Sequence, residues 1–159
     1  MKPTLRFLMS DPAHFIALGF GSGLMPKGPG TAGTLVGWLL FPFVRAPLSD
    51  PLFGGLLLAS FLFGILACER TGRALGVADH GGIVWDEIVA IWLVLWLTPP
   101  TLAWQATAFV LFRFFDIVKP PPIRWVDERT RGGLGVMFDD ILAAGYTLLV
   151  LAILVRLLG

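Results

Sequence analysis

The sequence predicts an all-α protein, a polytopic bundle of integral membrane helices with four to five spans. Hydrophobic residues make up 56% of its 159 residues, charged residues make up 14%, and the mean hydropathy is +0.80. A water-soluble domain ordinarily carries about 25% charged residues. Such a chain has too few polar side chains to cover its apolar surface, so lipid is the expected solvent for much of it. We expect residues 1–159 to form a single membrane domain.

The predicted helices are five apolar segments, at residues 35–44, 51–68, 83–97, 102–118 and 141–155. We expect helices because a membrane-spanning backbone must satisfy its own hydrogen bonds, and the alternating pattern of a closed barrel is absent from the sequence. A span needs about 20 residues, so only 51–68 is comfortably long on apolar residues alone. The short segment 35–44 contains Pro42, and whether it crosses fully is left open. Thr98-Pro99-Pro100-Thr101 and Pro120-Pro121-Pro122 interrupt the helical pattern.

Lysine and arginine are distributed unequally between the predicted loops. With five spans, one side carries nine of them: Lys2, Arg6, Lys27, Arg70, Arg73, Lys119, Arg124, Arg129 and Arg131. The other side carries Arg45 and Arg156. The positive-inside rule therefore places the amino terminus and every acidic helix end in the cytoplasm. With four spans, the charged loops stay together, but the amino-terminal segment lies on the opposite side.

Charged residues at the ends of the predicted spans are the first candidates for a site. They are Asp86, Glu87, Arg113, Asp116, Asp139 and Asp140. Each would cost about 2.5 to 3.5 kcal/mol at the centre of a lipid-facing helix, so we expect them to face one another, water or an ion. Three acidic groups from three helices would repel one another without a cation, and Mg²⁺ suits a set of oxygen ligands. A network of salt bridges is the alternative, and Arg113 and Asp116 have the spacing of a helical pair.

The glycine-rich stretch 19–34 has a different character. The helix that follows is expected to begin near Thr31, where free backbone N–H groups could bind an anion with help from Lys27. The stretch lacks the Gly-Lys-Ser/Thr sequence of a P-loop. Tight helix packing through Gly33 and Gly37 explains part of the glycine content equally well. Cys68 is expected to pack in an apolar run, and His80 is either a solvated loop residue or a proton donor or ligand.

Five sequence blocks resemble the phosphatidylglycerophosphatase A family. They are Gly-Phe-Gly-Ser-Gly at 19–23, Pro-Gly-Thr-Ala-Gly-Thr at 29–34, Ile-Val-Trp-Asp-Glu at 83–87, Phe-Arg-Phe-Phe-Asp-Ile-Val-Lys-Pro at 112–120 and Gly-Gly-Leu-Gly-Val-Met-Phe-Asp-Asp at 132–140. The resemblance covers about residues 17 to 145. It implies a mostly helical, Mg²⁺-dependent enzyme of the bacterial inner membrane that converts phosphatidylglycerophosphate to phosphatidylglycerol and phosphate.

The resemblance and the membrane argument select the same acidic residues. The expected Mg²⁺ ligands are Asp86, Glu87, Asp116, Asp139 and Asp140, with Asp86, Asp116 and Asp139 as the principal set. The expected catalytic residues are Asp86, Glu87 and Asp116, with Glu87 as the most plausible general base. The expected phosphate-binding residues are Lys27, Thr31, Thr34, Arg113 and Lys119. The number of metal ions and the nucleophile, either water or a carboxylate, stay open.

Two other functional classes were weighed against this hypothesis. A small ion-coupled transporter or channel subunit would explain intramembrane carboxylates, but a conduction path should place polar groups at several depths. A lipid phosphotransferase usually carries a repeated Asp-x-x-Asp pattern, which this sequence lacks. The expected partners are the lipid substrate and the membrane. No basic run suggests nucleic acid, and the oligomeric state is not indicated.

Overall fold

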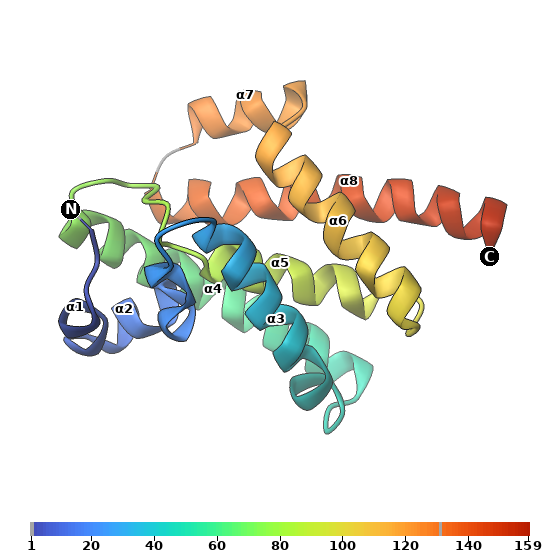
Figure 1. Cartoon of the computed structure of the whole chain (residues 1–159), viewed down its shortest axis with the longest axis horizontal. Coiled ribbons are helices and arrows are strands. Elements are labelled where there is room, and N and C mark those ends of the chain that lie inside the picture. The colour runs from blue at the N-terminus through green and yellow to red at the C-terminus, as the bar shows by residue number, and fades with distance from the viewer. Residues whose placement is uncertain (1, 131) are drawn as a thin grey trace.

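The computed structural model describes residues 2–130 and 132–159, and the regular elements in these residues are all helices (Figure 1). They are α1 (Leu5–Met9), α2 (Pro12–Ala17), the 3₁₀ helix η1 (Gly19–Leu24), α3 (Pro29–Arg45), α4 (Asp50–Leu75), α5 (Trp85–Trp96), α6 (Leu102–Val118), α7 (Pro121–Arg129) and α8 (Gly132–Leu158). The predicted all-α class is confirmed. Arg131, counted above among the loop cations, lies outside the described residues.

Each predicted apolar segment corresponds to a helix, but the bounds differ. The segment 83–97 was too long, because α5 covers only Trp85–Trp96, and other helices extend past their apolar residues. The segment 102–118 coincides with α6. The segment 51–68 was too short because α4 continues through Glu69, Arg70 and Arg73 to Leu75, where Gly76 caps it with φ +78°. The segment 141–155 was also too short, since α8 begins at Gly132 and places Asp139 and Asp140 inside the helix. Hydropathy marks only the apolar part of a helix, whereas backbone hydrogen bonding continues into its polar ends.

Helix α5 forms the centre of the bundle. Ten of its twelve residues are buried, and it packs against α3, α4, α6 and α8. Figure 1 shows α5 and α8 running in the same direction, with α4 and α6 running the opposite way. The N-terminal end of α5 therefore lies near α8 and near the C-terminal ends of α4 and α6. This arrangement brings the acidic motifs to one end of the bundle.

The outward faces of the surrounding helices are apolar. Exposed residues follow helical spacing on three of them: Leu35, Leu39 and Phe43 on α3, Leu58, Leu62 and Leu66 on α4, and Leu149, Ile153 and Leu157 on α8. Continuous apolar faces of this kind mark contact with lipid or with another protein. Among the described residues, α4 and α8 are the helices long and apolar enough to cross a membrane. The predicted count of four to five spans therefore stays a prediction.

Several glycines allow the helices to approach closely. A Cβ at Gly33 would lie 2.5 Å from the Val84 side chain, and one at Gly37 would lie 2.7 Å from Ile91. The expected packing role of these two residues between α3 and α5 is thereby confirmed. At the start of α8, a Cβ at Gly133 would lie 1.9 Å from the carbonyl oxygen of Ile65 on α4. The first turn of α8 therefore depends on a residue without a side chain.

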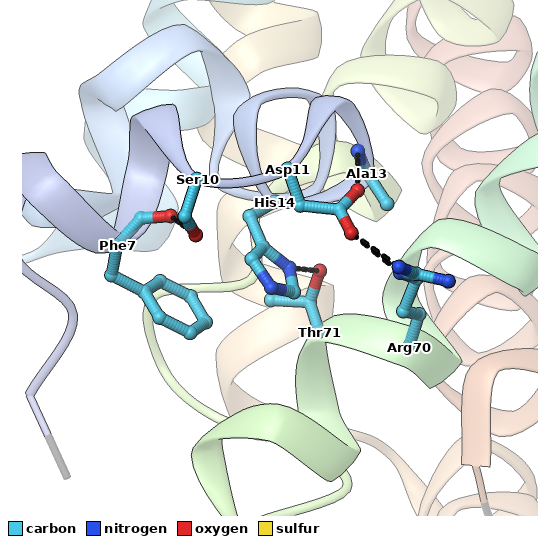
Figure 2. A network of polar contacts seen from close by, with 7 residues as sticks. All are labelled: Phe7, Ser10, Asp11, Ala13, His14, Arg70 and Thr71. Carbon is cyan, nitrogen blue, oxygen red and sulfur yellow. Dashed lines mark hydrogen bonds and ion pairs between the residues drawn. The ribbon is translucent and has the colours of Figure 1, made fainter.

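The amino-terminal helices are attached to the end of α4 by a polar network (Figure 2). Arg70 Nε donates a 2.7 Å hydrogen bond to Asp11, and His14 Nδ1 lies 2.9 Å from the Thr71 hydroxyl. The Phe7 ring stacks on His14 with a centroid separation of 4.2 Å. Desolvation lowers the pKa of His14, whereas the neighbouring Asp11 raises it. His14 thus has a structural role here.

Buried contacts also account for Cys68 and for the carboxylate of Glu69. Cys68 is fully buried, with its Sγ atom 4.0 Å from the Met137 sulfur, so its expected packing role is confirmed. Glu69 Oε2 accepts a 2.6 Å hydrogen bond from the backbone N–H of Gly133. An acidic group at a helix N-terminus satisfies a free N–H and interacts favourably with the helix dipole. Glu69 therefore fixes the start of α8 against α4.

Replacing Gly133 with alanine should destabilise the protein by about 1 to 3 kcal/mol, the typical cost of overpacking. The added methyl group meets a backbone carbonyl, which cannot rotate away. Gly145→Ala on the same helix is the matched control, because a Cβ there meets nothing within 4 Å. Thermal unfolding in detergent should show a lower midpoint for Gly133→Ala and an equal or higher one for Gly145→Ala. Equal midpoints for the two variants would contradict the packing argument.

Candidate active site

The first turn of α5 positions two carboxylates, Asp86 and Glu87. The preceding residues Ile83 and Val84 are 2% and 0% exposed, and the backbone N–H of Val84 donates a 2.9 Å hydrogen bond to Ala17. These contacts fix where the helix begins. Acidic side chains in a first turn interact favourably with the helix dipole, which offsets part of the cost of their burial.

Asp140 of α8 completes a buried triplet with Asp86 and Glu87. One carboxylate oxygen from each residue lies within 4.8 Å of the other two. Asp86 is 5% exposed, Glu87 is 8% exposed and Asp140 is 2% exposed. Within residues 2–130 and 132–159, Asp86 Oδ1, Glu87 Oε2 and Asp140 Oδ2 have no hydrogen-bond partner. Buried charges normally require a partner. The triplet therefore has the donor atoms, the spacing and the unmet charge of a divalent-cation site.

Helix α6 brings positive charge to the edge of this triplet. Arg113 forms an ion pair with Asp116 one turn further along the helix, and its Nη1 atom lies 3.9 Å from Glu87 Oε1. Lys119 caps α6 with a φ of +50°, and its Nζ atom lies 3.9 Å from Asp116 Oδ1. Asp116 thus contacts two cations and also lies beside the Asp140 carboxylate. The expected pairing of Arg113 with Asp116 is confirmed.

The N-terminal turn of α3 lies against the same site. A Cβ at Gly30 would lie 3.0 Å from Arg113 Nη2 and 3.2 Å from Glu87 Oε1, so only glycine permits this approach without displacing those groups. The Thr34 hydroxyl donates a 2.7 Å hydrogen bond to the Gly30 carbonyl and is fully buried. Lys27 and Thr31 are exposed where the chain enters α3. Within the described part of the chain, no ion pair connects Lys27 to the carboxylates.

Asp139 joins a different group of carboxylates. One oxygen of Asp139 lies within 4.8 Å of oxygens from Asp79, in the loop before α5, and Asp127, on α7. The sequence argument selected Asp86, Asp116 and Asp139 as the principal ligands. The structure instead clusters Asp86 with Glu87 and Asp140, pairs Asp116 with cations, and brings Asp139 to the second group.

Asp79 and Asp127 were missed by the sequence argument. Both lie in polar segments, where an acidic residue attracts no notice. Desolvation raises the pKa of Asp79, Lys119 lowers it, and Asp127 and Asp116 raise it. Desolvation lowers the pKa of Lys119, whereas carboxylates of both groups, Asp140, Asp127 and Asp139 among them, raise it. His80 follows Asp79 in the chain. Its Nδ1 atom accepts a 3.0 Å hydrogen bond from the backbone N–H of Gly82, which gives the side chain a local structural contact.

Comparison with known proteins identifies relatives across most of the chain. The family model for phosphatidylglycerophosphatase A matches residues 15–155. A phosphatidylglycerophosphatase A of Haemophilus influenzae is 44% identical over 151 residues, covering 94% of this chain and 92% of the relative. The protein of the same name from Escherichia coli is 44% identical over 143 residues, covering 87% and 80%.

A third relative carries a different name. It is a Bacteroides thetaiotaomicron protein named as a candidate phosphatidylinositol-3-phosphatase, 39% identical over 146 residues and covering 87% of this chain and 90% of the relative. No solved structure matches this chain significantly. The matched residues include all six clustered carboxylates, those of Asp79, Asp86, Glu87, Asp127, Asp139 and Asp140. The chain therefore belongs to the phosphatidylglycerophosphatase A family.

Proposed function

We propose that this protein is a Mg²⁺-dependent phosphatase that converts phosphatidylglycerophosphate to phosphatidylglycerol and phosphate at the cytoplasmic face of the bacterial inner membrane. The observation that carries the proposal is the buried triplet of Asp86, Glu87 and Asp140, with unpartnered oxygens and Arg113 at its edge. Two relatives named phosphatidylglycerophosphatase A support the substrate. The proposal treats residues 1–159 as one functional unit.

The donor set fits a hard divalent cation. All three ligands are carboxylate oxygens, which Mg²⁺ prefers together with retained water and substrate phosphate oxygens. Asp86, Glu87 and Asp140 would hold the cation, whose two positive charges would offset two of the three carboxylate charges. A bound cation of this kind stabilises negative charge on a phosphoryl group and lowers the pKa of a bound water.

The remaining residues divide into two roles. Arg113 and Lys119 carry the positive charge that would bind phosphate oxygens, and Asp116 holds both near the triplet. Lys27 and Thr31 would meet the phosphate from the N-terminal turn of α3, whereas the Thr34 hydroxyl already serves the helix backbone. The unpartnered second oxygen of Glu87 has two candidate roles, as a ligand of the cation or instead as the general base. Water and a carboxylate both stay candidates for the nucleophile.

The proposed membrane arrangement has five crossings, made by α3, α4, α5, α6 and α8. In Figure 1 these five helices run in alternating directions along the chain, with the short helix α7 between α6 and α8. Helix α5 has 12 residues and is about 18 Å long, so it is too short to cross the roughly 30 Å of hydrocarbon by itself. Its neighbours shield it from lipid, however, and the loops at its ends complete the crossing.

The position of the site suits a lipid headgroup. The carboxylates lie at the end of the bundle that carries most of the lysine and arginine, which the positive-inside rule assigns to the cytoplasm. A phosphate at headgroup level could reach this end while the acyl chains stay in the bilayer. The site's confinement to one end also argues against the rival transporter, whose path would need polar groups at several depths.

Neutralising a carboxylate of the triplet, or Asp116 beside it, should abolish turnover. We expect Asp86→Asn, Asp140→Asn and Asp116→Asn each to lose phosphate release from phosphatidylglycerophosphate by about two orders of magnitude or more, comparable to removing a key transition-state contact. Phosphate release by purified protein, with Mg²⁺ and with EDTA, is the measurement. Phosphatidylinositol-3-phosphate should be assayed in parallel. Normal Mg²⁺-dependent turnover in any variant would remove that residue from the catalytic site.

Cation binding should also be visible in the stability of the protein. For the wild type, Mg²⁺ at 100 times its dissociation constant should stabilise the folded state by about 2.7 kcal/mol. Asp140→Asn should unfold at a higher temperature than the wild type in EDTA, because one of three repelling buried charges is removed, and should gain less from Mg²⁺. Thermal unfolding with and without Mg²⁺ tests both expectations. An Asp140→Asn variant that gains as much as the wild type would exclude Asp140 as a ligand.

A further inference from the structure

We propose that Asp79, Asp127 and Asp139 form a second divalent-cation site, separate from the triplet of Asp86, Glu87 and Asp140. The three residues come from the loop between α4 and α5, from α7 and from α8, and one oxygen from each lies within 4.8 Å of the others. A cation held there would connect two peripheral segments to a helix of the central bundle.

The Asp139 side chain supplies the independent observation. Asp139 is 4% exposed, and its Oδ1 atom has no hydrogen-bond partner in the described structure. Leaving a charged group buried and unpartnered is costly, so proteins normally provide it with a donor or a cation. The described cations nearby do not form an ion pair with Asp139 within 4.0 Å. The unpartnered oxygen is therefore available as a ligand.

The second site differs from the first in its access to water. Asp86, Glu87 and Asp140 are all buried. In the second group Asp139 is buried, Asp127 is partly exposed and Asp79 is exposed. Water could therefore complete the coordination of a cation at the second site, as Mg²⁺ usually requires. Weaker and more readily exchanged binding is expected, because partial solvation reduces the electrostatic attraction.

Two adjacent residues of α8 belong to different sites. Asp139 and Asp140 are consecutive, so their side chains leave the helix about 100° apart and reach different neighbours. Lys119 interacts with both of them and with Asp127. Its single positive charge cannot balance six carboxylates, so it does not replace either cation.

Counting bound Mn²⁺ on the purified full-length protein tests the proposal. Mn²⁺ replaces Mg²⁺ as a spectroscopic probe, and electron paramagnetic resonance measures free and bound ion. We expect two equivalents per wild-type chain, with the second bound more weakly. Asp127→Asn should weaken the second equivalent by more than about tenfold, because loss of even an outer-shell group costs that much, and should retain the first. Asp140→Asn should have the opposite effect.

Glu128→Gln is the matched control, since it removes an exposed charge from the neighbouring position of α7. It should retain both equivalents. One equivalent in the wild type, two unaltered equivalents in Asp127→Asn, or loss of both in Asp127→Asn would each overturn the proposal. Retention of the first equivalent also shows that the variant is folded.

Hydrogen exchange supplies a second test that does not depend on activity. Mn²⁺ should slow exchange in residues 77–84 and 121–129 of the wild type, and not in Asp127→Asn. Equal slowing in both proteins would also contradict the second site. Since neither measurement uses a lipid substrate, failure to hydrolyse phosphatidylglycerophosphate would refute the proposed function and leave this inference standing.

Discussion

The structure depends on one constraint, which is the burial of three carboxylates where the central helix α5 begins beside α8. Asp86, Glu87 and Asp140 lie among apolar side chains, where charge is costly to leave without a partner. An apolar core would be more stable without them. The cation that we propose for this site accounts for their presence, and the surrounding helices hold the three carboxylates together.

Close packing of the helices brings the residues of this site together. Gly33 and Gly37 let α3 approach α5, and Gly133 lets α8 approach α4. Gly30 then brings the first turn of α3 against Arg113 and Glu87. Because van der Waals packing provides much of the association between membrane helices, the same glycines contribute to stability and to the shape of the site.

The sequence predicted the helical class and singled out most of the charged residues that the structure clusters in the candidate site, because charge is conspicuous in an apolar chain. Asp86, Glu87, Arg113 and Asp116 were found for this reason. The sequence could not predict which carboxylates Asp139 and Asp140 each lie beside, because this depends on the rotation of α8 about its axis. Asp79 and Asp127 were missed because acidic residues are ordinary in polar loops and short amphipathic helices, where composition carries no signal.

The placement of α7 combines an apolar contact with an electrostatic cost. A chain leaving α6 at Lys119 could extend into water, yet Pro121–Arg129 forms a helix that packs on α8. This contact brings Asp127 towards Asp139, two like charges that would repel each other without a compensating cation. Ile123, which is fully buried, anchors the helix from its apolar side. Apolar anchoring and cation binding would then act together, so that the order of this segment would depend on the ions that the site holds.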